Sequence, residues 1–144
     1  VNLQGCENEV TDYEKLEELL NSYSNLDIEI REIELKVRGS SLRGIELNGM
    51  PKGNNVSSPI ENELIYVERL ENEKIYLQIK KESVNNMLNL LDDFERNLIE
   101  LRYFKKLQYK QISYELNISE LYVGKKRKKA LDKILPFAKK YNLI

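Results

Sequence analysis

The sequence predicts an all-α protein in which a long, coiled-coil-like pair of N-terminal helices precedes a C-terminal helix-turn-helix domain. Three observations favour this class. Apolar residues recur at helical spacing along most of the chain. A short helix, a tight turn and a basic helix follow one another near the C-terminus. The 144 residues also include only six glycines and three prolines, which favours long regular elements over a loop-rich fold.

The composition excludes several classes of protein. The chain has no histidine and a single cysteine, Cys6, so a disulfide framework, a zinc finger and any histidine-dependent catalytic or metal site are excluded. No window approaches 18 consecutive apolar residues, so we expect no transmembrane helix and no membrane partner. We expect residues 1–10 to be a disordered terminus with a free thiol, which suits a reducing, cytoplasmic setting.

The near-neutral net charge of −1 conceals a division of the chain. Residues 1–101 carry 11 basic and 21 acidic side chains, whereas residues 102–144 carry 12 basic and 3 acidic ones. The C-terminal segment therefore has a net charge of +9. Such asymmetry indicates a basic module attached to an acidic one, and the usual partner of a basic module is nucleic acid.

A first helix is expected over residues 11–38. Thr11 and Glu14 have the spacing of a capping box at its start, and Gly39 is the expected stop. Apolar residues recur at alternating steps of three and four, which is a heptad pattern. This assembly seam consists of Leu16, Leu19, Tyr23, Leu26, Ile30, Ile33 and Val37. A stripe this narrow needs a partner helix.

Residues 39–57 are expected to form a connector within an assembly domain over 11–91. Ser58, Pro59 and Glu61 then suit the start of a second helix that runs to about Leu91. Its expected stripe is Ile60, Leu64, Val67, Leu70, Leu77, Val84, Leu88 and Leu91. The two helices either pair with each other as an antiparallel hairpin or pair with those of a second chain, as a homo-oligomer.

Residues 92–144 are expected to form a three-helix unit. Asp92 or Asp93 caps a helix through Phe104, and a short helix spans Tyr109–Leu116. Asn117 tolerates the left-handed conformation of a tight turn, Ser119 caps a third helix, and Pro136 ends it after residue 135. On a helical wheel Val123, Arg127 and Ile134 point inward. The outward side carries Leu121, Tyr122, Lys125, Lys128 and Lys129, as the recognition helix of a DNA-binding protein requires.

The C-terminal unit resembles region 4 of sigma-70 factors. Residues 91–104 read Leu-Asp-Asp-Phe-Glu-Arg-Asn-Leu-Ile-Glu-Leu-Arg-Tyr-Phe, with an acidic-aromatic cap, a Glu-Arg pair and a Leu-Arg-Tyr-Phe ending. Residues 109–119 match the next helix and turn, and Val123 and Ala130-Leu131 match the recognition helix. A heptad helix, a loop with Gly49-Met50-Pro51 and a second long helix also resemble the RinA/ArpU group of phage-encoded transcriptional regulators.

The resemblance implies an activator that binds double-stranded DNA and works with host RNA polymerase. It places the base-reading positions on Glu120, Leu121, Tyr122, Gly124 and Lys125. It places phosphate contacts on Arg102, Lys110, Ser119, Lys126 and Lys129, to which the basic outward face adds Lys128. Leu121 and Gly124 stand where region 4 often has polar readers, so the promoter preference of host sigma factors does not carry over.

Other functions fit parts of the pattern. A DNA-packaging recognition subunit, similar to a small terminase, also joins a helix-turn-helix to coiled-coil helices. An unusual sigma factor is less favoured, because residues 1–91 have no aromatic-basic cluster suited to single-stranded DNA. A purely helical adaptor would leave the basic C-terminal segment without a role. We expect no enzyme, no cofactor and no metal, since Asp92-Asp93 is more simply a helix cap and no nucleophile-base set is visible.

Overall fold

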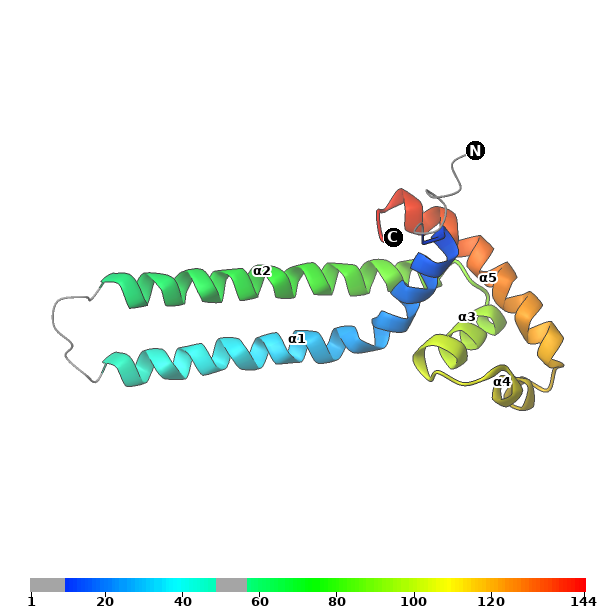
Figure 1. Ribbon diagram of the computed structural model, residues 1–144, viewed down its shortest axis with the longest axis horizontal. Helices are drawn as coiled ribbons and strands as arrows, with labels where there is room; N and C mark the ends of the chain where they lie inside the picture. The colour runs from blue at the N-terminus through cyan, green and yellow to red at the C-terminus, as the bar shows by residue number, and fades with distance from the viewer. Residues whose placement is uncertain (1–9, 49–56) are drawn as a thin grey trace, which may run out of the picture. The chain divides into compact units, whose positions relative to one another are not determined.

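The computed structural model describes the backbone of residues 10–48 and 57–144, and the side chains of residues 10–40 and 61–144. The described part is helical throughout, with no strand, which confirms the predicted all-α class (Figure 1). The expected disordered terminus, Cys6 and the loop with Gly49-Met50-Pro51 lie outside the described residues. The elements are α1 (Asp12–Asn48), α2 (Ser57–Leu88), α3 (Asp93–Ile99), the π-helix η2 (Glu100–Phe104), α4 (Tyr109–Leu116) and α5 (Glu120–Lys140).

The chain forms two compact units whose boundaries differ from the expected division at residue 91. The hairpin unit is Asn25–Lys81, formed by most of α1 and α2. The other unit joins the start of α1, up to Ser24, to Glu82–Ile144. We call this second part the helix-turn-helix unit. The helix-turn-helix thus folds together with an N-terminal segment that lies about a hundred residues earlier in the chain.

In the hairpin unit, α1 and α2 run antiparallel and side by side within one chain (Figure 1). Asp27 of α1 pairs with Lys81 of α2, and Glu34 pairs with Lys74 at 3.5 Å. The seam residues Leu26 and Ile33 are buried, while Ile30 and Val37 are half-buried. Of the two alternatives, the structure thus shows the hairpin within one chain.

Two expectations about these helices were wrong. Gly39 does not end α1, which continues to Asn48 and removes the first half of the expected connector. No described glycine has a positive φ, so Gly39 does not form the left-handed cap that its position suggested. Leu64 does not belong to the buried stripe of α2, because its side chain is 65% exposed. The side of α2 that faces α1 instead includes the half-buried Lys74 and Lys81. A search for apolar residues alone does not identify these two lysines.

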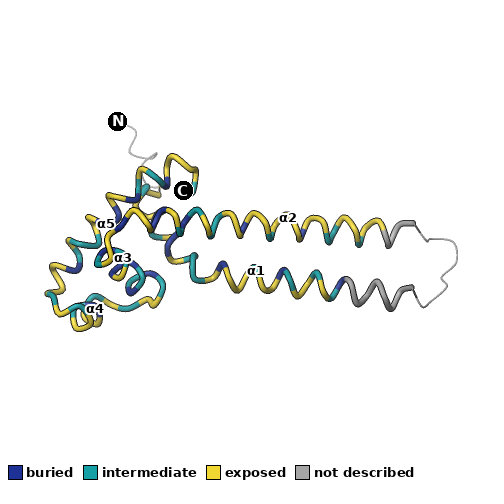
Figure 2. Tube along the Cα trace, turned by 180° about the vertical axis from the view of Figure 1, so that it is seen from behind, coloured by how far each residue is buried: buried dark blue, intermediate teal, exposed yellow. Residues whose placement is uncertain are grey.

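A large hydrophobic core joins several helices of the helix-turn-helix unit. Its buried members come from the start of α1, the end of α2, η2 and the inner side of α5, and dark blue segments mark their positions in Figure 2. They include Leu16, Leu19, Leu20, Val84, Met87, Leu88, Tyr103, Ala130, Leu131 and Ile134. The first two seam residues therefore pack in the same core as α5.

Local signals explain the boundaries of the short helices. The Asp92 carboxylate accepts from the Glu95 N–H at 2.7 Å, so Asp92 is the N-cap of α3. The helix expected through Phe104 changes to π geometry at Glu100, whose carbonyl accepts from the Lys105 N–H at 2.9 Å. Pro136 does not end α5, which continues to Lys140 because the following turn packs, with Ala138 fully buried.

This core predicts that α1 stabilises the helix-turn-helix unit. Leu20→Ala removes a fully buried side chain from the core and should lower the free energy of unfolding by about 2–5 kcal/mol. The matched control Leu90→Ala, at a site that is 53% exposed in the same unit, should change it by less than about 0.5 kcal/mol. Urea unfolding followed by circular dichroism measures both values. Equal effects of the two substitutions would show that α1 does not belong to this core.

Candidate nucleic-acid interface

The candidate interface is built on the α4–turn–α5 segment. Asn117 ends α4 in the left-handed conformation, with φ 56° and ψ 49°, as its position predicted. Ser119 then caps α5, since its hydroxyl accepts from the Tyr122 N–H at 3.1 Å. The Ile118 N–H also donates to the Ser113 carbonyl at 3.1 Å and closes the turn. These bonds fix where α5 begins relative to α4.

A small apolar cluster sets the rotation of α5 about its axis. Val123 is fully buried with Ile112 of α4 and Leu98 of α3. Phe94, Leu107, Tyr109, Leu116 and Ile118 pack around this cluster. Because one side of α5 is held in this way, the opposite side of its first three turns must face solvent.

The solvent side of α5 presents most of the predicted base-reading and phosphate residues. Leu121 is 73% exposed, and Tyr122, Lys125, Lys128 and Lys129 are also exposed. Glu120 is exposed in the first turn. Gly124 is turned toward α4 instead, since a methyl group at this position would lie 3.6 Å from Tyr109 Cε2. The structure therefore does not bring Gly124 together with the outward group.

Several cations of the basic segment are engaged inside the unit. The Arg102 guanidinium donates to the Leu107 carbonyl at 3.0 Å and lies 4.9 Å from the centre of the Tyr109 ring. Lys126 Nζ lies 5.7 Å from the Phe94 ring and 5.5 Å from the Tyr122 ring. Both cations are half-buried, so their first role is to position α3, η2 and α5.

Arg127 faces inward, as the helical wheel predicted, and the structure identifies its partners. Its Nη1 donates to Glu17 Oε1 of α1 at 2.5 Å and to the Tyr103 hydroxyl of η2 at 3.1 Å. Burial alone would lower the pKa of this guanidinium, but the hydrogen bonds with Tyr103 and Glu17 raise it on balance. Burial also raises the pKa of the Tyr103 hydroxyl. We call Glu17, Tyr103 and Arg127 the arginine clamp.

A second ion pair ties α3 to α5. Glu95 is only 1% exposed, and its Oε1 accepts from Lys133 Nζ at 2.6 Å. The hydrogen bond to Glu95 raises the pKa of Lys133 above its usual value. Glu95 Oε1 also accepts from the Asp92 N–H at 3.3 Å, so one carboxylate joins the cap of α3 to α5. Glu17, Tyr103 and Glu95 were not identified from the sequence, since no local pattern links residues that are so far apart in the chain.

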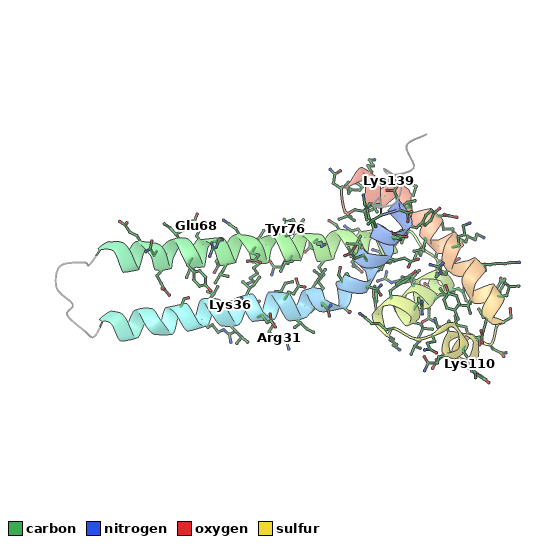
Figure 3. The ribbon with its side chains drawn as sticks, in the orientation of Figure 1. Arg31, Lys36, Glu68, Tyr76, Lys110 and Lys139 are labelled. Carbon is green, nitrogen blue, oxygen red and sulfur yellow. The ribbon has the colours of Figure 1, made fainter. Side chains whose placement is uncertain are left out.

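Once these contacts are assigned, four of the exposed lysines that form no ion pair among the described residues lie on α4 and the first turns of α5, while Lys105, Lys106 and Lys140 lie outside these turns. Lys110 of α4 and Lys125, Lys128 and Lys129 of α5 are exposed and form no ion pair within the part of the chain that the structure describes. Figure 3 labels Lys110, which lies on α4 beside the start of α5. Tyr114 follows one turn later on α4 and is 78% exposed. These residues, with Leu121 and Tyr122, make a basic surface with aromatic and aliphatic tips, which we call the α4–α5 surface.

Among the described residues there is neither a cluster that could hold a metal ion nor a helix that could cross a membrane. Among residues 10–48 and 57–144, no three acidic, cysteine or histidine side chains gather in a way that could hold a metal ion. No described helix combines the length and the apolar character needed to cross a membrane.

On α5, replacing a lysine that is held in an ion pair should lower the stability of the fold, whereas replacing an exposed, unpaired lysine should not. Lys133→Met leaves the buried Glu95 carboxylate without its cation, so the free energy of unfolding should fall by about 1–3 kcal/mol. Lys129→Met is the matched control on the same helix and should leave stability within about 0.5 kcal/mol. Thermal unfolding at neutral pH without DNA measures both. If the Lys133→Met protein is as stable as the control, the Glu95–Lys133 ion pair does not stabilise the fold.

Comparison with known proteins places the chain in a family. No curated protein and no solved structure matches it significantly. A family model described as "Protein of unknown function (DUF722)" matches residues 12–136, which include α1, the helix-turn-helix and most of α5. Because the match covers most of the sequence, the chain belongs to the DUF722 family.

Proposed function

We propose that the chain is a sequence-specific DNA-binding transcription regulator that uses the α4–α5 surface to bind double-stranded DNA. The observation that carries the proposal is the separation of cations on α5. Arg127 and Lys133 are held by Glu17 and Glu95, while Lys125, Lys128 and Lys129 project to solvent without an ion pair among the described residues. A surface of this kind attracts phosphates, which release bound counterions when they are neutralised.

The shape of the segment supports binding in the major groove. In a helix-turn-helix, the N-terminal part of the second helix contacts base edges and the first helix crosses the backbone. Here Leu121, Tyr122 and Lys125 occupy the exposed first turns of α5, and Lys110 occupies the exposed first turn of α4. Lys125 can donate to guanine O6 or N7, while Leu121 and Tyr122 can contact thymine methyl groups.

The remaining contacts would fall on the phosphates. Lys128 and Lys129 are placed to neutralise the backbone beside α5. Arg102 and Lys126 would act mainly by holding the fold. The resemblance to region 4 of sigma-70 and to RinA/ArpU regulators adds host RNA polymerase as a proposed partner and the bacterial cytoplasm as the proposed location. It suggests an activator of phage promoters.

The second candidate is a DNA-packaging recognition subunit. The specific observation in its favour is the hairpin unit, whose outer faces carry exposed apolar side chains suited to assembly. Such a protein would bind DNA through the same lysines but would discriminate little among sequences. Sequence preference therefore separates the two candidates.

Two substitutions on α5 test base reading against charge neutralisation. Lys125→Ala should lose about 1–3 kcal/mol of binding free energy on the preferred site and relax the preference at one base pair. Its binding to random DNA should change much less. Lys129→Ala is the matched control and should weaken binding to all sequences alike, with a salt slope that falls by about 1.

Fluorescence anisotropy on a preferred duplex and a scrambled duplex, over a series of salt concentrations, measures both effects. If Lys125→Ala loses the same binding free energy on both duplexes, Lys125 contacts phosphates and does not read a base. No salt-dependent binding by the wild-type chain would contradict the proposed function itself.

A further inference from the structure

The hairpin unit has a second apolar stripe on α2, opposite its buried seam. Five large apolar side chains of this helix are at least half exposed: Leu64, Ile65, Ile75, Tyr76 and Ile79. At about 100° per residue they fall within a sector of roughly 120° on the side away from the buried Leu70 and Leu77. We call this stripe the outer face of α2. The stripe consists of two apolar groups, Leu64 with Ile65 and Ile75 with Tyr76 and Ile79, and Glu68 lies between them. Large exposed apolar groups that are flanked by polar residues often mark an interaction surface.

The other helix has an outer face as well. Ile28 and Leu35 are both more than half exposed and lie seven residues apart, again opposite the seam. Arg31 and Arg38 each follow three residues later and are also exposed. Among the described residues neither arginine forms an ion pair. In Figure 3, Arg31 lies on the side of α1 that faces away from α2.

The charges on the two outer faces are opposite in sign. Glu68 lies within the stripe of α2, between Leu64 and Ile75, and Glu61 and Glu71 lie on or beside it. All three glutamates are exposed. The outer face of α2 thus carries a net negative charge, although the exposed Arg69 lies at its edge. The outer face of α1 carries a net positive charge, because the exposed Glu32 balances only one of its two arginines. The inner flanks have the reverse signs, with Asp27 and Glu34 on α1 facing Lys81 and Lys74 on α2.

We propose that the outer face of α1 in one copy of the chain docks on the outer face of α2 in the next copy. This contact covers both apolar faces and brings Arg31 and Arg38 toward acidic side chains. A symmetric contact between two α2 helices would instead gather glutamates of like charge and leave the α1 face uncovered. Head-to-tail contacts of this kind close into a ring or extend as a filament.

Charge reversal on full-length chains, without DNA, tests this contact. The native mass should be a multiple of the 17.0 kDa chain and should rise with protein concentration. Arg31→Glu with Arg38→Glu should reduce the mass to that of one chain, and so should Glu68→Arg with Glu71→Arg. An equal mixture of the two variants should assemble again, because each then offers the complementary face to the other. Lys36→Glu, a reversal on α1 away from its outer face, is the control and should assemble normally.

Light scattering after size exclusion reads the masses, and circular dichroism checks that each variant remains folded. A wild-type chain that is monomeric at every concentration would overturn the proposal. So would assembly that survives Arg31→Glu with Arg38→Glu but is lost with Ile75→Asp, since that pattern identifies a symmetric α2 contact. Failure of the two reversed variants to assemble together would also overturn it. None of these results depends on DNA binding, so the proposed function is tested separately.

Discussion

Arg127 is part of the most basic run in the chain, yet its guanidinium faces the protein and donates to Glu17 and Tyr103. A half-buried cation without these partners would be costly, so the start of α1, η2 and α5 are held in one arrangement. Once Arg127, Val123 and Ile134 all face inward, the rotation of α5 is set. Lys125, Lys128 and Lys129 then have only solvent, or a ligand, to face. The candidate interface is therefore a consequence of the packing on the other side of the same helix.

The acidic N-terminal part of the chain has a structural role in the basic C-terminal part. Asp12 pairs with Lys139 at 2.7 Å, Tyr13 donates to Asp132, and Glu17 pairs with Arg127. Cations at these positions are satisfied within the unit and attract phosphates less. Of the exposed lysines that form no ion pair among the described residues, Lys110, Lys125, Lys128 and Lys129 lie on α4 and the first turns of α5, while Lys105, Lys106 and Lys140 lie outside them. The division of charge along the sequence is thus partly neutralised in the fold, and the uncompensated charge is concentrated where a helix-turn-helix would meet DNA.

Helical periodicity and capping chemistry predicted most of the fold, because both depend on neighbours in sequence. Asn117 in the left-handed turn, Ser119 as a cap and the inward position of Arg127 all follow from local rules. The bound at Pro136 failed because the following turn packs against the core, with Ala138 fully buried. The bound at Gly39 failed because α1 continues through this residue without a positive φ. The seam position of Lys74 was missed because its charge is compensated by Glu34, 40 residues away. The partners of Arg127 in the arginine clamp could not be predicted, because no local sequence pattern links them to it. The resemblance to RinA/ArpU regulators remains a prediction that the DUF722 match does not test.

The central claim is that α5 reads a DNA sequence rather than merely attracting phosphates. Selection of bound duplexes from a random pool by the full-length chain, at near-physiological salt, tests it most directly. The account predicts enrichment of a common motif that depends on Leu121, Tyr122 and Lys125, and that is kept when Lys129 is replaced. A pool that stays random while still binding the protein in a salt-dependent way would contradict sequence-specific readout.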